Sequence, residues 1–239
     1  MAATKKETVI TLKPIKLTSA NVRIVGDTPL LVHKWTFKAM RELVMGSDKI
    51  ARKIPRNPFA EVAASLYWME PERDPFPFTA NMVTDPEGTE YYALLDKYEA
   101  YTEEDLLRDM EGARFGFPVT GVKSAGISAV FRNGLHKNKV SLQAGFFIRG
   151  EGEQQLTEIK FEGPVGIRQD TVRVGMGSAD MRYRPVFENW SMNLEVQFDK
   201  NGVLDLTNIV NIINRGGHFN GIGEWRLEKG GQFGAYHVE

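Results

Sequence analysis

The sequence predicts an α+β protein whose core follows the order strand, helix, strand, strand, helix, strand. Apolar and polar side chains alternate over residues 190–198, which is the period of a half-buried strand. Residues 206–213 repeat apolar side chains at i, i+3, i+4 and i+7, as an amphipathic helix does, and Asp205 is a suitable N-cap. Residues 119–131 carry an apolar stripe among small residues, which indicates a helix that lies close to a sheet.

Turn and capping residues place the other elements. The expected strands are 21–25, 140–148, 156–161, 190–198 and 233–238, and the expected helices are 36–45, 58–66, 103–110, 119–131 and 206–213. The βαββαβ order is that of the ferredoxin-like fold, so we expect one domain over residues 20–239, with a tail or an edge strand over 1–19. Residues 27–117 are then an insertion after the first strand, and residues 163–185 form a protruding β-hairpin.

Composition limits the classes of protein that remain. The 239 residues are 42% hydrophobic and 26% charged, as in an ordinary globular protein. The sequence has no cysteine, which excludes disulfides, thiolate metal sites and cysteine nucleophiles. No apolar run approaches the roughly 18 residues of a membrane span, and residues 1–6 lack the apolar region of a secretory signal. We therefore expect a cytoplasmic protein that makes no use of a membrane.

The net charge of −1 conceals a strong asymmetry along the chain. Residues 70–111 contain thirteen acidic and three basic side chains, a net charge of −10, which leaves +9 for the rest. This segment is either a solvated surface insertion or a site for a protein partner. Its aromatic residues could form an interaction surface, but we favour a small core within the insertion. They are Phe76, Phe78, Tyr91, Tyr92, Tyr98 and Tyr101.

Basic residues gather in two places outside that segment. Residues 34–56 carry seven basic and two acidic side chains, and four arginines lie on the expected hairpin. Lysine and arginine on loops and strand faces can follow a phosphate backbone without reading its sequence, although a solvated charged face is the common alternative. Trp35 or Tyr183 could stack a base. The candidate nucleic-acid-binding residues are Lys49, Arg52, Lys53, Arg56, Lys123, Arg168, Arg173, Arg182 and Arg184.

A glycine-rich loop separates the last helix from the last strand. Glycine permits a close approach of the backbone to another group, so this loop could cradle phosphates, contact a neighbouring subunit or pack the helix on the sheet. Its glycines are Gly221, Gly223, Gly230, Gly231 and Gly234.

The four histidines have no metal-ligand spacing, and no nucleotide-binding or catalytic motif is present. We therefore expect no metal, no cofactor and no catalytic residue. His33 next to Lys34 leaves one enzymatic alternative, because a histidine can move protons while a lysine stabilises phosphate charge.

The region 190–238 resembles the C-terminal half of the RAMP superfamily, the repeat-associated proteins of CRISPR systems. It has a strand, a helix, a glycine-rich loop and a final strand, with the loop beginning His218-Phe219-Asn220-Gly221-Ile222-Gly223-Glu224-Trp225-Arg226. The resemblance is best to the backbone subunits of Cascade-type complexes, and it extends to bacteriophage proteins that end in a Gly-x-Gly-x-Trp-Arg segment. It implies a ferredoxin-like core, a helical insertion at 27–117, a β-hairpin thumb at 163–185 and assembly along a nucleic-acid strand.

The sequence thus favours a non-enzymatic protein that binds single-stranded RNA or DNA and assembles as a homo-oligomer or filament in a bacterial or phage-infected cytoplasm. One alternative is a phage or mobile-element protein-interaction module that mimics or blocks a host complex through residues 70–111. The other is a metal-independent endoribonuclease.

Overall fold

The computed structural model describes residues 13–46, 55–84, 87–174 and 178–239. Its fold combines α-helices with antiparallel sheets, as the sequence predicts. The elements of the main sheet and its two long helices are β1 (Leu17–Gly26), α6 (Val119–Arg132), β4 (Phe146–Arg149), β6 (Lys160–Glu162), β9 (Asn189–Asp199), α8 (Leu206–Arg215) and β10 (Tyr236–Val238).

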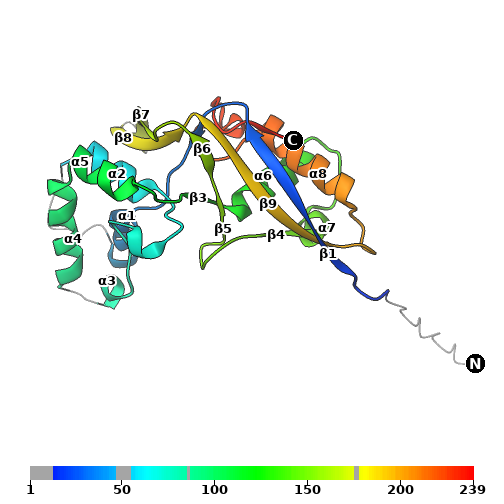
Figure 1. The fold of residues 1–239 in the computed structure, drawn as a ribbon, viewed down its shortest axis with the longest axis horizontal. Helices are drawn as coiled ribbons and strands as arrows, with labels where there is room; N and C mark the ends of the chain where they lie inside the picture. The colour runs from blue at the N-terminus through cyan, green and yellow to red at the C-terminus, as the bar shows by residue number, and fades with distance from the viewer. Residues whose placement is uncertain (1–12, 47–54, 85–86, 175–177) are drawn as a thin grey trace, which may run out of the picture.

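The main sheet has the strand order β10-β1-β9-β4, and every neighbouring pair is antiparallel. β6 also pairs with β9. The central strands β1 and β9 alternate buried and exposed residues, so one sheet face is apolar. That face and the helices α6 and α8 share one hydrophobic core, to which Val22, Leu194 and Ile213 belong. Figure 1 shows both helices beside the long strands of this sheet.

The inserted region folds into a helical module at one end of the molecule (Figure 1). Its elements are α1 (Phe37–Met45), α2 (Pro58–Ser65), the 3₁₀ turn η2 (Pro71–Arg73), α3 (Asn81–Thr84), α4 (Thr89–Ala100) and α5 (Glu103–Met110). The expected aromatic core is confirmed, because Phe76, Tyr91, Tyr98 and Tyr101 are buried. Phe78 and Tyr92 are partly buried against the same core.

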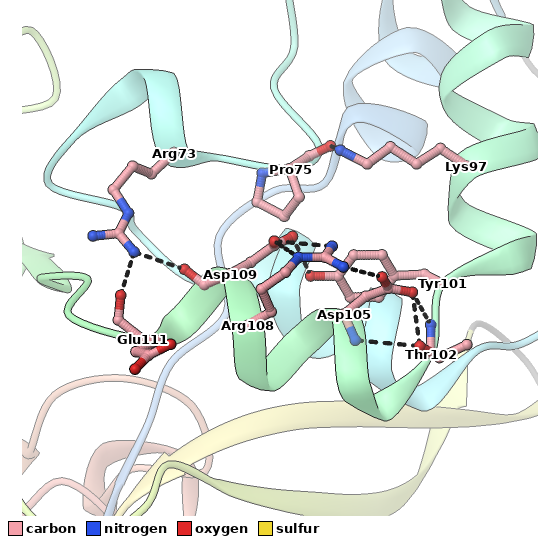
Figure 2. A network of polar contacts seen from close by, with 9 residues as sticks. All are labelled: Arg73, Pro75, Lys97, Tyr101, Thr102, Asp105, Arg108, Asp109 and Glu111. Atoms are coloured by element: carbon pink, nitrogen blue, oxygen red, sulfur yellow. Dashed lines mark hydrogen bonds and ion pairs between the residues drawn. The ribbon is translucent and has the colours of Figure 1, made fainter.

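Polar contacts hold the acidic segment together internally (Figure 2). Arg73 donates to the backbone oxygen of Asp109 at 3.1 Å, and Lys97 donates to that of Pro75 at 3.0 Å. Arg108 pairs with Asp105 at 2.8 Å. All three basic residues of the segment thus bind within it.

The basic residues 34–56 and the acidic residues 70–111 pack against each other, and some of their opposite charges form pairs. Lys34 pairs with Asp74 in a mostly buried contact. Arg41 is buried, donates to the backbone oxygen of Met82 at 3.1 Å and lies over the Tyr91 ring. These two basic side chains of residues 34–56 therefore bind the acidic segment 70–111 and are not available to a ligand.

A second sheet contains the expected hairpin in the order β2-β8-β7. Its strands are β2 (Leu30–Leu31), β7 (Gly166–Val174) and β8 (Ser178–Phe187). β8 also packs on α2, so the hairpin is held against the helical module instead of standing free along its length. A small separate sheet joins β3 (Gly116–Pro118) to β5 (Leu156–Glu158).

Four expected elements differ from the structure. The strand predicted over 156–161 is divided into β5, which pairs with β3, and β6, which pairs with β9. The strand predicted over 140–148 is wrong in its first half, where residues form α7 (Lys139–Ala144); Asn138 caps this helix by accepting from the Ser141 amide. The final strand begins three residues later than predicted. The helix α8 continues past Gly216 into a π-helical turn, η3 (Gly216–Asn220), and the 3₁₀ turn η4 (Leu227–Lys229) follows within the glycine-rich loop.

The predicted N-cap Asp205 is confirmed, since its side chain accepts a hydrogen bond from the first turn of α8. Thr36 and Thr102 cap α1 and α5 in the same way. β1 begins at Leu17, so the last residues assigned to the tail or edge strand belong to the sheet. Among the described residues, no helix is long and apolar enough to cross a membrane.

Candidate functional site

Two adjoining cavities lie where the helical module, the hairpin, the glycine-rich loop and α6 meet. The larger, which we call the Trp35 cavity, has a volume of about 530 Å³, and the smaller, the α6 cavity, about 400 Å³. Both are lined by His33 and Glu224, so the two cavities adjoin at these residues, and we call the pair the groove. This groove is where single residues from all these elements come together.

His33 occupies the junction of the two cavities. Its Nδ1 lies 3.3 Å from the Ser65 Oγ, within hydrogen-bond distance. Burial lowers the pKa of His33, and the nearby Arg184 guanidinium lowers it further. The imidazole is therefore neutral at neutral pH and can accept or donate a hydrogen bond.

Lys38 of α1 contributes a cation to the Trp35 cavity. Its Nζ lies 3.7 Å from the centroid of the Tyr98 ring. Burial lowers the pKa of Lys38 from its ordinary 10.5 to about 8. Within the described ranges, no carboxylate lies within 4 Å of this amine. Lys38 thus keeps its charge at pH 7, and the carboxylates of Glu61 and Asp180, which raise its pKa, only partly offset the effect of burial.

Trp35 forms the rim of the same cavity and is 59% exposed. The residues around it are fixed: the Lys34 amide donates to the Ser65 oxygen at 2.8 Å, and the Thr36 side chain caps α1. A large exposed aromatic ring on a fixed backbone is suited to stacking on a planar partner.

Arg56 is committed to other side chains of the protein. It donates to Glu61 at 2.7 Å and also pairs with Asp180 on β8. Glu61 is buried on α2 and accepts from the Tyr183 amide at 3.2 Å, so it joins the module to the hairpin. Sequence reasoning missed Glu61; the available signal was a carboxylate inside the apolar helix Pro58–Ser65.

The expectation that Arg184 lies on an exposed strand face is wrong. Its side chain is only 2% exposed, and it donates to the buried Asp170 at 3.0 Å. Arg168 also binds Asp170, at 2.9 Å, and lies over the Phe233 ring of the glycine-rich loop. Asp170 thus has two paired cations, as a buried carboxylate requires. Through its contact with Phe233, Arg168 also joins the hairpin to the glycine-rich loop.

The remaining candidates divide into three groups. Lys123 donates to the backbone oxygens of Gln143 and Phe146, so it supports the end of α7. Arg182 lines the Trp35 cavity with only a 3.6 Å contact to Asp180. Lys49, Arg52 and Lys53 lie outside the described residues, as does the side chain of Arg173.

The glycine-rich loop is packed tightly at its centre. A Cβ at Gly223 would lie 2.3 Å from the Leu31 oxygen, and one at Gly234 would lie 1.8 Å from the Ile222 oxygen. At these two positions, therefore, glycine is needed for close packing of the loop within the protein. At Gly230, by contrast, a Cβ would meet no atom within 4 Å.

In the described part of the chain, no three His, Asp or Glu side chains are grouped so that they could hold a metal ion. No protein-family model matches the chain, and comparison with curated proteins gives no match.

Proposed function

We propose that the protein is a non-enzymatic binder of single-stranded nucleic acid and that the groove is its binding site. The observation that carries this proposal is the exposed Trp35 beside Lys38 and Arg182 in one cavity. Proteins that hold single strands combine aromatic rings, on which bases stack, with cations that meet the phosphates. Both components are present here on a rigid framework.

The proposal includes a ferredoxin-like core and a relationship to the RAMP superfamily. When the core strands β1, β4, β9 and β10 are numbered 1 to 4 in chain order, their order across the sheet is 4-1-3-2. Every neighbouring pair is antiparallel. A βαββαβ chain of ferredoxin-like topology has this order. The position of the helices α1 to α5 after β1, and of the hairpin β7–β8 before β9, supports the proposed relationship. Assembly of several copies along one strand in the cytoplasm is part of the same proposal.

A fluorescence-anisotropy titration tests the function. Labelled single-stranded RNA and DNA are titrated at two salt concentrations, with size-exclusion chromatography of the same samples to detect assembly. We expect binding that weakens with salt and complexes that contain several protein copies. Absence of binding to any strand at low salt would refute the proposal.

The contribution of the two cations is predicted by counterion release. Replacing both Lys38 and Arg182 by Gln should reduce the slope of log affinity against log salt by about 1.4, because each phosphate contact with a single strand contributes about 0.7. The matched control replaces Arg23 and Arg149, which pair with Glu239 and Glu195 outside the groove, by Gln; its slope should stay unchanged. An unchanged slope in the first variant would remove these residues from the interface.

The lowered pKa of Lys38 predicts a pH dependence. Affinity for an oligoadenylate should fall about fivefold as the pH rises from about 7 to 9, because the amine loses its charge near pH 8 and with it a contact of ~1 kcal/mol. Lys38→Arg, whose guanidinium stays charged, should give a flat profile.

The free energy of unfolding should, in contrast to the affinity, increase with pH between about pH 8 and 10.5. The unfolded chain holds the Lys38 proton up to its ordinary pKa of 10.5, whereas the folded chain releases it near 8. The unfolded state then binds more protons, so the free energy of unfolding rises with pH between these values. If the wild type binds the oligoadenylate equally well at pH 7 and pH 9, the role of Lys38 in binding is contradicted.

The enzymatic alternative has one observation in its favour, the neutral His33 at the centre of the groove. A neutral imidazole can remove the proton from a ribose 2′-hydroxyl without a metal. Incubation of labelled RNA with the protein in EDTA discriminates this alternative: cleavage that His33→Ala abolishes would establish it, and intact RNA would support binding alone.

A further inference from the structure

The α6 cavity differs chemically from the Trp35 cavity that it adjoins. One wall is α6, which presents the hydroxyl residues Thr120, Ser124 and Ser128. The other wall is the glycine-rich loop, with Glu224 and Arg226. A volume of about 400 Å³ is within the range of small-molecule sites and can hold one nucleotide.

The α6 cavity offers a phosphate no cation comparable to Lys38 and Arg182, which line the Trp35 cavity. Arg226 donates to Glu228 at 3.0 Å and to the backbone oxygen of Gly223 at 3.1 Å, so its charge is already compensated. Glu224 is not compensated in this way. Among the described residues, Arg184 is the one cation within 4 Å of its carboxylate, at 3.8 Å, and Arg184 binds Asp170 more closely. The cavity therefore presents a carboxylate whose one close cation, within the described ranges, is shared with Asp170.

The backbone holds Glu224 in a fixed position. Its amide donates to the Leu31 oxygen at 2.9 Å. The two flanking residues, Gly223 and Trp225, both have positive φ, +76° and +49°. Such a conformation is strained for tryptophan, and backbone strain of this kind is retained where the surroundings impose it. The backbone that carries this carboxylate is thus fixed before any ligand arrives.

A fixed carboxylate accepts hydrogen bonds and donates none, so it selects a partner with adjacent N–H groups. Among the common bases, guanine presents two such donors side by side, at N1 and the 2-amino group. Uracil presents one N–H between two oxygens, which a carboxylate repels. Unstacked bases of single strands are commonly read at this edge.

We propose that the α6 cavity receives one base of the bound strand and that Glu224 makes this position selective for guanine. The inference rests on the proposed function, since the shared lining of His33 and Glu224 lets a strand in the Trp35 cavity place a base in its neighbour. Phosphate contacts alone would bind every sequence equally.

The test is a set of anisotropy titrations with labelled oligouridylates that carry one central guanine, adenine or inosine. The wild type should bind the guanine strand about tenfold more tightly than the adenine strand, as a bidentate contact to a base allows. Inosine keeps N1–H but lacks the 2-amino group, so its affinity should lie between the two.

Two variants test whether the preference for guanine arises in the α6 cavity. Glu224→Gln should abolish it while leaving the salt slope unchanged, and Ser124→Phe, at an exposed position, should abolish it by filling the cavity from the opposite wall. The control Glu195→Gln, on β9 and 46% exposed, should keep it. Equal affinity of the wild type for all three strands, or a preference that survives in both variants, overturns the inference and leaves the proposed function standing. A wild type that binds none of the strands refutes the proposed function itself.

Discussion

Replacing Phe37 by Ala is expected to lower the free energy of unfolding by about 3–5 kcal/mol, the usual cost of removing a buried phenylalanine ring. Phe37 is 1% exposed, and its ring lies within about 6 Å of three others, those of Phe76, Tyr91 and Tyr98. The variant should also lose protection of the acidic segment, because this aromatic core is what holds residues 70–111 to α1. Urea denaturation followed by circular dichroism measures the first effect, and limited proteolysis measures the second.

The matched control is Leu43→Ala on the same helix. Leu43 belongs to the apolar pattern of α1 but is 67% exposed, so its replacement should change stability by no more than about 0.5 kcal/mol. Equal losses in both variants would show that the helix is oriented differently. Early cleavage within residues 70–111 of the wild type would show that the segment is not integrated into the fold.

Replacing Asp170 by Ala is expected to cost about 3–5 kcal/mol as well, because it leaves the buried Arg184 guanidinium without its partner. The nearest remaining carboxylate, that of Glu224, is 3.8 Å away. Combining Asp170→Leu with Arg184→Met should restore most of the loss, since a buried ion pair can be replaced by apolar side chains of similar size at little cost. Denaturant midpoints of the three proteins provide the measurement.

Asp180→Ala is the control for this prediction. Asp180 lies on the same hairpin and also contacts two arginines, Arg56 and Arg182, but these side chains are partly exposed. Exposed ion pairs contribute about 0–1 kcal/mol, so the control should lose far less stability than Asp170→Ala. If the two aspartates cost the same, burial is not what distinguishes them.

The helices that the sequence predicts well are those whose ends are marked by local side chains. Thr36, Thr102 and Asp205 each cap a helix within three residues, and such contacts can be recognised without knowledge of the fold. The helix α4 was not predicted. Its N-cap is Gly88, which has no side chain to cap it, and its buried tyrosines depend on Phe37 and Phe76, which are distant in sequence.

The strand predicted over residues 140–148 was wrong for a related reason. Alternating apolar residues there suit a strand, but α7 is stabilised by Asn138 and by Lys123, which donates from α6 to backbone oxygens at the end of α7. A contact of this kind depends on the packing of two elements and leaves no mark in the local pattern.

The candidate site was predicted in part. Trp35 and the glycine-rich loop are conspicuous in the sequence, and the structure places both beside the groove. The ion pairs Arg184–Asp170 and Arg56–Asp180 could not be predicted, because a count of charges does not show which of them are neutralised on folding. The count therefore overstated the number of cations available to a ligand.

The central position of β1 has a consequence for the order in which a nascent chain can fold. β1 ends at Gly26, but its long partner β9 begins at Asn189, and its other partner β10 begins at Tyr236. At about 5–20 residues per second, translation reaches β9 roughly ten to thirty seconds after β1. The aromatic core of the helical module is complete in the chain by Tyr101. The module can thus mature while translation continues, whereas β1 must wait unpaired, and the groove cannot form until Glu224 has been synthesised.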